Sequence, residues 1–324
     1  MFIADLHCDT LSALYTKERL GESVNLMEND LQLDVKKMER GNYILQNFAV
    51  FVDWGEEEPY VCAKEQIRLF SQQTKLCEGK LRQARTFQEM EENARKGIIS
   101  AVLTLEEGEI CQGDLRKLEE MYQFGARMMT FTWNYENSLA SPANPDDRRT
   151  PVRGQGGLTE IGIAFLEKME ELGMIVDVSH LSDEGIADVL KYSKKRIAAS
   201  HSNSRSLCSH PRNLRDEQIR SIAEKGGIIG VNYYGSFLTE KETGGVYFSR
   251  VEDIARHMEH MVQTGGIGCV GLGSDFDGMD DNLELKGAFA MELLWEALRK
   301  RGFTESEVEA VCYKNVWEFY REML

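Results

Sequence analysis

An alternation of two patterns along the chain restricts its fold more than any other feature. Short apolar, β-branched runs, typical of buried strands, alternate with longer stretches that have the periodicity of amphipathic helices. The strand-like runs occupy residues 2–7, 43–52, 98–105, 126–132, 174–178, 196–200, 227–233 and 269–273, and the clearest helical stretches occupy 61–77, 115–124, 161–172, 182–192, 216–224 and 251–264. Such alternation predicts parallel strands joined by helices, and eight such units close naturally into a (β/α)8 barrel of the TIM type.

The main alternative fold is an open, doubly wound α/β sheet. No GxGxxG motif follows an early strand, so nothing in the sequence supports the dinucleotide site typical of that fold. The 324 residues include only five prolines and no Ser/Gly-rich linker. We therefore expect residues 1–324 to form a single barrel domain.

The charge and the cysteines of the chain narrow the classes of partner and compartment. The formal net charge of −16 disfavours nucleic acid and anionic membranes as partners. No secretory signal pattern is visible, and no apolar run reaches the roughly 18 residues of a membrane span. The seven cysteines are odd in number and form no CxxC pair. These features predict reduced thiols and a cytoplasmic protein.

Chemically active residues gather at the carboxyl ends of the predicted strands, where barrel active sites lie. These residues are His7 at the end of the first run and Asp9 just beyond it, Glu106 after the third, His180 after the fifth, His201 after the sixth and Asp275 after the eighth. Residues two apart in a strand point the same way, so His7 and Asp9 should project together toward the mouth of the barrel and Cys8 away from it. A cluster of this composition is typical of a metal site.

The types of these residues indicate the metal. Imidazoles and carboxylates without thiolate suit zinc, manganese, iron or cobalt. Six ligands exceed the needs of one catalytic zinc, so we expect two divalent ions bridged by Glu106, with a bridging hydroxide as nucleophile. Asp275 is expected to bind metal and to move the proton, so that Glu106 and Asp275 are the catalytic candidates. A barrel that binds a metal or metabolite without catalysis is the alternative from another class of protein.

The remaining three histidines do not follow this pattern. His257 and His260 lie in the predicted helix 251–264 and are expected at its surface. His210 lies in a loop after a strand, where a structural role is favoured over a functional one.

Six segments carry a resemblance to a known family. The series DLHCDT, LEEGE, DVSH, SHSNSR, HPRN and GSDFDG, which spans nearly the whole chain, resembles the membrane (renal-type) dipeptidases and their bacterial relatives. The resemblance implies an amidohydrolase-like (β/α)8 barrel and a metalloprotease with two zinc ions that hydrolyses dipeptides, including some with a C-terminal D-residue. It assigns one zinc to His7, Asp9, Glu106 and Asp275, and the other to Glu106, His180 and His201.

The resemblance also implies substrate contacts and one departure. Arg212 matches the family arginine that grips the substrate carboxylate, and Tyr234 matches a position that lines the substrate site. Animal members carry an oxyanion-stabilising histidine after strand four, where this chain has Trp133, with Asn134 and Asn137 as other donors. Dimerisation is implied by the resemblance alone. Deacylation of N-acyl amino acids, lactone opening and phosphoester cleavage remain open, because a shared fold does not fix the function.

Overall fold

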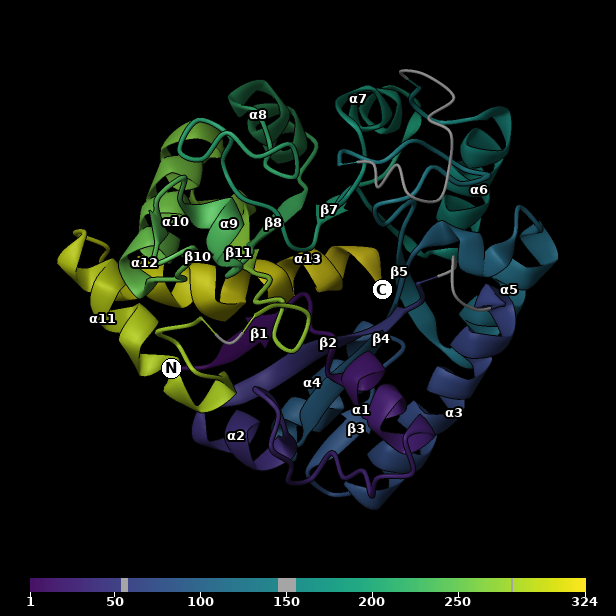
Figure 1. Cartoon of the computed structure of the whole chain (residues 1–324), viewed down its shortest axis with the longest axis horizontal. Coiled ribbons are helices and arrows are strands. Elements are labelled where there is room, and N and C mark those ends of the chain that lie inside the picture. The colour runs from purple at the N-terminus through teal and green to yellow at the C-terminus, as the bar shows by residue number, and fades with distance from the viewer. Residues whose placement is uncertain (54–57, 145–155, 281) are drawn as a thin grey trace.

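Eight parallel strands form a closed ring in the computed structural model, which describes residues 1–53, 58–144, 156–280 and 282–324. The ring order is β1, β2, β4, β5, β6, β7, β8 and β11, and β11 pairs with β1 again. These strands are Ile3–Asp5, Tyr43–Phe51, Ile99–Glu106, Ala126–Thr130, Ile175–Asp177, Ala198–Ala199, Ile228–Val231 and Val270–Leu272. The predicted (β/α)8 barrel is confirmed, and all eight predicted strands are present (Figure 1).

Three strands were not predicted. The short strand β3 (Leu81–Gln83) pairs with the first half of β4, and β5 pairs with its second half. The strands β9 (Glu242–Thr243) and β10 (Val246–Tyr247) form an antiparallel hairpin outside the ring. These strands have two or three residues each, which is too short for a period to be visible in the sequence.

The helices surround the ring (Figure 1). Several begin where a side chain caps the first turn: Thr159 and Ser182 accept backbone N–H groups at the starts of α6 and α7. Helices α5 and α6 end at Gly125 and Gly173, which adopt the left-handed conformation that glycine permits. The α-helices are α1 Thr10–Arg19, α2 Val35–Arg40, α3 Pro59–Leu76, α4 Phe87–Arg95, α5 Leu115–Phe124, α6 Glu160–Leu172, α7 Asp183–Tyr192, α8 Asp216–Glu224, α9 Gly235–Leu238, α10 Val251–Gly265, α11 Glu292–Lys300, α12 Glu305–Glu309 and α13 Asn315–Met323.

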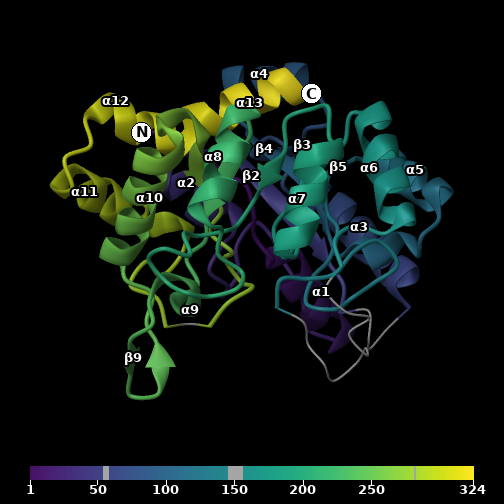
Figure 2. The same ribbon diagram turned by 90° about the horizontal axis from the view of Figure 1, so that it is seen from above.

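The C-terminal helix α13 packs at one end of the barrel. Val316, Phe319 and Tyr320 of α13 share a buried apolar cluster with residues of several ring strands. The Tyr320 hydroxyl donates to Asn47 Oδ1 of β2 at 2.8 Å. In Figure 2, α13 and α4 lie at the end opposite α9 and the β9 hairpin. That end is therefore occupied by side chains, and the site described below lies at the other.

Candidate metal centre

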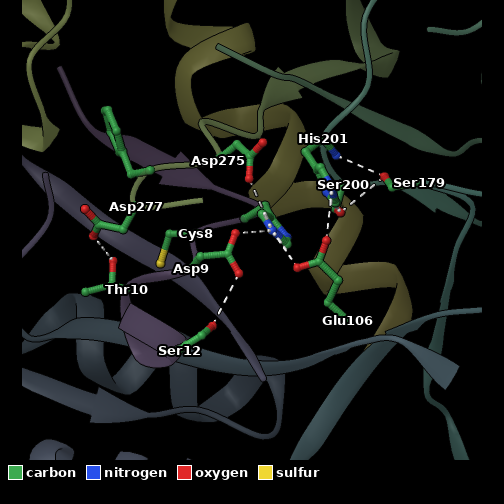
Figure 3. Close-up of polar contacts among 12 residues, drawn as sticks. Cys8, Asp9, Thr10, Ser12, Glu106, Ser179, Ser200, His201, Asp275 and Asp277 are labelled. Atoms are coloured by element: carbon green, nitrogen blue, oxygen red, sulfur yellow. Dashed lines mark hydrogen bonds and ion pairs between the residues drawn. The ribbon is translucent and has the colours of Figure 1, made fainter. Parts of the chain in front are cut away.

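The six predicted ligand residues converge at the carboxyl ends of five strands. All six are at most 9% exposed, although each carries a polar or charged side chain. Figure 3 shows the carboxylates of Asp9, Glu106 and Asp275 pointing into one common region, with His201 beside Glu106. The Cys8 thiol donates instead to Asn47 O of the neighbouring strand, as the two-residue period predicts.

The first of two groups is centred on His7. Its Nε2 lies 3.3 Å from Asp9 Oδ2, 3.3 Å from Glu106 Oε2 and 3.7 Å from Asp275 Oδ1. Asp9 occupies the N-cap position of α1, but its side chain caps no backbone N–H. The Asp9 carboxylate is therefore available to the His7 group.

The second group consists of two histidines. His180 Nε2 and His201 Nε2 lie 2.9 Å apart, and they lie 3.1 Å and 3.5 Å from Glu106 Oε1. Glu106 thus presents one oxygen to His7 and the other to the histidine pair. This is the arrangement expected of a carboxylate that bridges two cations.

Burial and close contact shift the pKa values of the residues in the site. Burial opposes the charged form of His7, but the carboxylates of Glu106 and Asp9 outweigh it and raise its pKa well above the usual value. Burial, together with the neighbouring carboxylates of Asp9 and Glu106, raises the pKa of Asp275 to about 8. Burial and the nearby Arg212 guanidinium lower the pKa of His180 to about 3. Buried carboxylates beside imidazoles are a donor set suited to divalent cations.

The geometry of the donor atoms also fits metal ions. Ligand atoms of His7, Glu106 and His201 all lie within 4.8 Å of one another, and so do those of His7, Asp9 and Asp275. Three carboxylates and three imidazoles of this kind match zinc, manganese, iron or cobalt by ligand type.

Asparagines orient two of the ligand side chains. His180 Nδ1 lies 3.2 Å from Asn134 Oδ1, so a proton on Nδ1 leaves Nε2 free to bind a cation. Asn232 Nδ2 donates to Asp275 Oδ2 at 2.9 Å. Asn134 was expected near the substrate; it lines the cavity and also contacts His180. Asn232 was missed: it lies within the predicted run 227–233, but β8 ends at Val231, so Asn232 directly follows the observed strand.

A cavity of about 740 Å³ lies over the ligand residues. Arg212, Tyr234, Trp133 and Asn134, the predicted substrate contacts, all line it. His210 also lines it; its Nδ1 accepts the backbone N–H of Arg212 at 3.2 Å, a contact compatible with the structural role that the sequence favoured. The cavity therefore combines the ligand carboxylates with one buried guanidinium and several aromatic rings.

Arg212 is buried and has unused hydrogen-bonding capacity. Its Nη2 donates to His201 O at 3.1 Å, and its guanidinium lies 5.5 Å from the centre of the Phe237 ring. Its Nε is buried and has no hydrogen-bond partner among the described residues. Burial lowers the pKa of Arg212 to about 10, so the group remains a cation at neutral pH.

A buried acid that sequence reasoning missed holds the loop after β5. Glu107 accepts the backbone N–H of Trp133 at 2.9 Å and a bond from the Asn137 amide. The Asn137 amide donates to Glu107 and to Phe131 O, so it does not serve as the oxyanion donor that the sequence left open. Burial raises the pKa of Glu107 to about 7. The doubled acid in LEEGE was the only signal in the sequence.

The surface placement predicted for His257 is wrong. His257 is fully buried: its Nδ1 accepts the N–H of Ser204 at 3.1 Å, and its Nε2 lies 3.1 Å from Leu238 O. The face of α10 that carries it packs against α9 and the loop after β7. His260 is half-buried and pairs with Asp216 at 2.9 Å.

Comparisons with known proteins agree on one family. The family whose sequence profile matches residues 1–323 is described as membrane dipeptidase, peptidase family M19. A metallopeptidase of Rhodobacter sphaeroides, solved with a phosphinate mimic of L-Ala-D-Ala, superposes with a TM-score of 0.89 at 24% identity over 100% of this chain and 99% of that chain. A dipeptidase of family M19 gives a TM-score of 0.89 at 25% identity over 100% and 98%.

A sequence relative is less informative about activity. An uncharacterised Klebsiella pneumoniae protein from the pqqA 5′ region is 29% identical over 261 residues, which is 78% of this chain and 96% of that protein. Among the described residues, no helix is long and apolar enough to cross a membrane.

Proposed function

This chain belongs to the membrane dipeptidase family, peptidase family M19, and is a metal-dependent dipeptidase; we propose that it hydrolyses dipeptides at a centre of two divalent ions, which we take to be zinc. The observation that carries the proposal is the position of Glu106. Its two oxygens face two separate histidine groups, and Glu106 itself lines the cavity together with His180 and Arg212.

We assign one ion to His7, Asp9, Glu106 and Asp275, and the other to Glu106, His180 and His201. When bound, two such ions polarise a carbonyl oxygen and lower the pKa of water enough to supply hydroxide at neutral pH. The buried carboxylates hold the ions, and Asn134 keeps the ring of His180 oriented.

Two residues act on the substrate directly. The guanidinium of Arg212 binds the C-terminal carboxylate, because its fork of donors suits a carboxylate and its Nε is unused. Asp275 takes the proton of the attacking water and delivers it to the leaving amine. Its contact with Asn232 holds one oxygen in place while the other faces the site. Tyr234 and Trp133 line the space for the two side chains of the dipeptide.

A substrate panel tests this proposal. The zinc-loaded protein is expected to release amino acids from L,L- and L,D-dipeptides, and to leave tripeptides and C-terminally amidated dipeptides uncut. Hydrolysis confined to N-acetyl amino acids would favour a deacylase, and confinement to lactones or phosphoesters would favour those alternatives. A protein that binds zinc but cleaves no dipeptide of a broad panel would contradict the proposal.

The Arg212→Met variant tests the carboxylate contact. Because it removes one partner of a buried charge pair, kcat/KM for dipeptides should fall about 100-fold while bound zinc is retained. Arg220→Met, at an exposed position of α8, is the matched control and should leave kcat/KM unchanged. Equal activity of the two variants would remove Arg212 from the substrate site.

We also propose that the protein is cytoplasmic. All seven cysteines are free and buried, which supports a reducing compartment such as the cytoplasm.

A further inference from the structure

A buried aspartate outside the ligand set supports the loops that carry both histidines of the second group. Asp177, the last residue of β6, is 3% exposed. Its Oδ1 accepts the backbone N–H groups of Ser179 at 3.0 Å and Ser200 at 2.9 Å. Ser179 and Ser200 directly precede His180 and His201, so one carboxylate oxygen fixes the start of both ligand loops.

The second oxygen of Asp177 begins a chain of hydrogen bonds that ends on an imidazole. Ser200 Oγ donates to Asp177 Oδ2. The same Oγ lies 2.7 Å from His201 Nδ1, and Figure 3 shows Ser200 and His201 beside each other. A hydroxyl has one proton to donate, and an ionised carboxylate can only accept. Because the Ser200 proton is directed to Asp177, its oxygen must accept from His201, and His201 Nδ1 therefore carries the proton.

We propose that Asp177 and Ser200 are positioning residues that fix His201 in the Nδ1–H tautomer and thereby set the metal affinity of the histidine pair. This inference rests on the proposed function only in taking His201 as a metal ligand. In that tautomer the lone pair of Nε2 faces His180 Nε2 at 2.9 Å and Glu106 Oε1 at 3.5 Å, which is where a cation shared with Glu106 must lie.

The hydrogen-bond chain from Asp177 through Ser200 to His201 is called the relay below. The His7 group has a similar aspartate without such a chain, and it therefore serves as a control. Asp5 Oδ1 accepts the N–H groups of His7 at 3.1 Å and Ser274 at 3.0 Å, the same backbone pattern as that of Asp177. Asp5 Oδ2, however, has no hydrogen-bond partner among the described residues. Asp5 thus supports its ligand loops without a link to an imidazole ring.

Three variants separate the relay from the support of the backbone. In Asp177→Asn, the amide –NH₂ replaces Oδ2 and donates to Ser200, whose proton then turns to His201 Nδ1. His201 is left with a proton on Nε2, where it cannot bind metal. Ser200→Ala removes the link without reversing it. Asp5→Asn makes the same chemical change as Asp177→Asn, but no imidazole is linked to it.

The measurement is retention of zinc against a graded chelator series, read by elemental analysis on the zinc-loaded proteins. Loss of a ligand-orienting partner typically costs 10- to 100-fold in metal affinity. We expect the affinity for one of the two zinc ions to fall about 100-fold in Asp177→Asn and about 10-fold in Ser200→Ala. In Asp5→Asn the zinc affinity should fall about 3-fold or less. In ¹⁵N spectra of histidine-labelled protein, the His201 proton should move from Nδ1 in the wild type to Nε2 in Asp177→Asn.

Several results would overturn the relay. Equal losses in Asp5→Asn and Asp177→Asn would show that only the backbone support matters. Wild-type zinc affinity in Ser200→Ala would likewise show that only the backbone support matters. If Asp177→Asn does not fold, the zinc affinity of Ser200→Ala alone tests the relay. A wild-type protein that binds no zinc would overturn the metal centre and this inference together. Normal zinc binding with the expected losses but no dipeptide hydrolysis would overturn the proposed function and leave the relay standing.

Discussion

At the scale of single residues, the backbone at the site departs from strand geometry as soon as the strands end. His180 and Asp275 adopt φ angles of 66° and 64°, in the left-handed region that costs a residue with a side chain about 1 kcal/mol or more. Backbone hydrogen bonds keep them there: Ala143 N donates to His180 O, and Asp275 N donates to His7 O. The sequence predicted that these residues lie at the mouth, but the conformation that aims each side chain is set by bonds to other loops.

Trp133 and Phe51 form an aromatic wall of the cavity, with ring centres 4.9 Å apart. Phe51 ends β2, which lies across the ring from β7, and Arg212 follows β7. A dipeptide held by its carboxylate at Arg212 therefore directs its N-terminal residue toward this wall. Trp133→Ala should lower kcat/KM about 10-fold for dipeptides with a large apolar N-terminal residue, since one fully buried apolar side chain contributes about 1.5–3 kcal/mol.

Dipeptides with N-terminal glycine are the control for the Trp133 variant, because glycine has no side chain to place on the wall. Their kcat/KM should change by no more than about twofold. A loss of the same size for both kinds of substrate would mean that Trp133 acts on steps common to all substrates. Stabilisation of the oxyanion, the role that the resemblance assigns to this position in animal members, is such a step.

At the scale of helices and strands, local signals predicted most of the fold. The bounds of α5 and α8 were predicted as observed, because a capping or charged start and a glycine or basic end lie in the sequence itself. The sixth run was predicted as residues 196–200, yet β7 comprises only Ala198–Ala199, since the backbone N–H of Ser200 donates to the Asp177 side chain and not to a neighbouring strand. His257 was misplaced for a similar reason: its partners, Ser204 and Leu238, belong to segments remote in the sequence.

Two glycines allow β7, β8 and β11 to approach closely below the ligand loops. A Cβ built on Gly273 or on Gly230 would overlap the carbonyl oxygen of Ser200, which is backbone and cannot move aside. Gly273→Ala should therefore lower the free energy of unfolding by about 3 kcal/mol, as expected for overpacking. Gly268→Ala, where a Cβ meets nothing within 4 Å, should change it by less than about 1 kcal/mol. Urea unfolding measures both, and equal values would contradict the close approach.

The burial of His257 predicts a pH dependence of stability. Burial lowers the pKa of His257 to about 4 from 6.5, so between these values the unfolded chain binds a proton that the folded chain does not. The stabilisation is complete above pH 6.5 and is lost as the pH falls, by about 1.4 kcal/mol per pH unit. In His257→Gln, which does not titrate, the free energy of unfolding at pH 7.5 should lie below that of the wild type.

That difference between His257→Gln and the wild type should shrink by about 1.4 kcal/mol between pH 7.5 and pH 5.5. Other titrating groups affect both proteins alike and cancel in the comparison. A difference that does not change with pH would mean that His257 is protonated equally in the folded and unfolded states.

At the scale of the whole molecule, closure of the ring creates the two ligand groups. β11 pairs with β1, which brings Asp275 beside His7 and Asp9, and β6 pairs with β7, which brings His180 beside His201. Glu106, from β4, reaches both groups. The alternation of strands and helices predicts this neighbourhood once a closed barrel is assumed. It does not predict Asp177, Asn232 or Glu107, because buried polar partners carry no period.

The same closure means that the metal ions and the barrel should stabilise each other. Without cations, three carboxylates lie together in a buried site with the charge of His7 as their main compensation. Each ion that binds only the folded chain adds about 4 kcal/mol when its free concentration is about 1,000 times Kd. For 324 residues this corresponds to about 6 °C in Tm for each ion.

Chelation should therefore lower Tm by about 6–12 °C and leave the far-ultraviolet circular dichroism at 20 °C unchanged, because the apolar clusters around and below the strands need no metal. Adding zinc back should restore Tm, and calorimetry with elemental analysis follows both quantities on one sample. In Glu106→Gln the zinc-dependent rise in Tm should largely disappear, since an amide bridges two cations poorly. Complete removal of metal with no change in Tm would show that the site contributes nothing to folding and that its buried carboxylates are neutralised by protons.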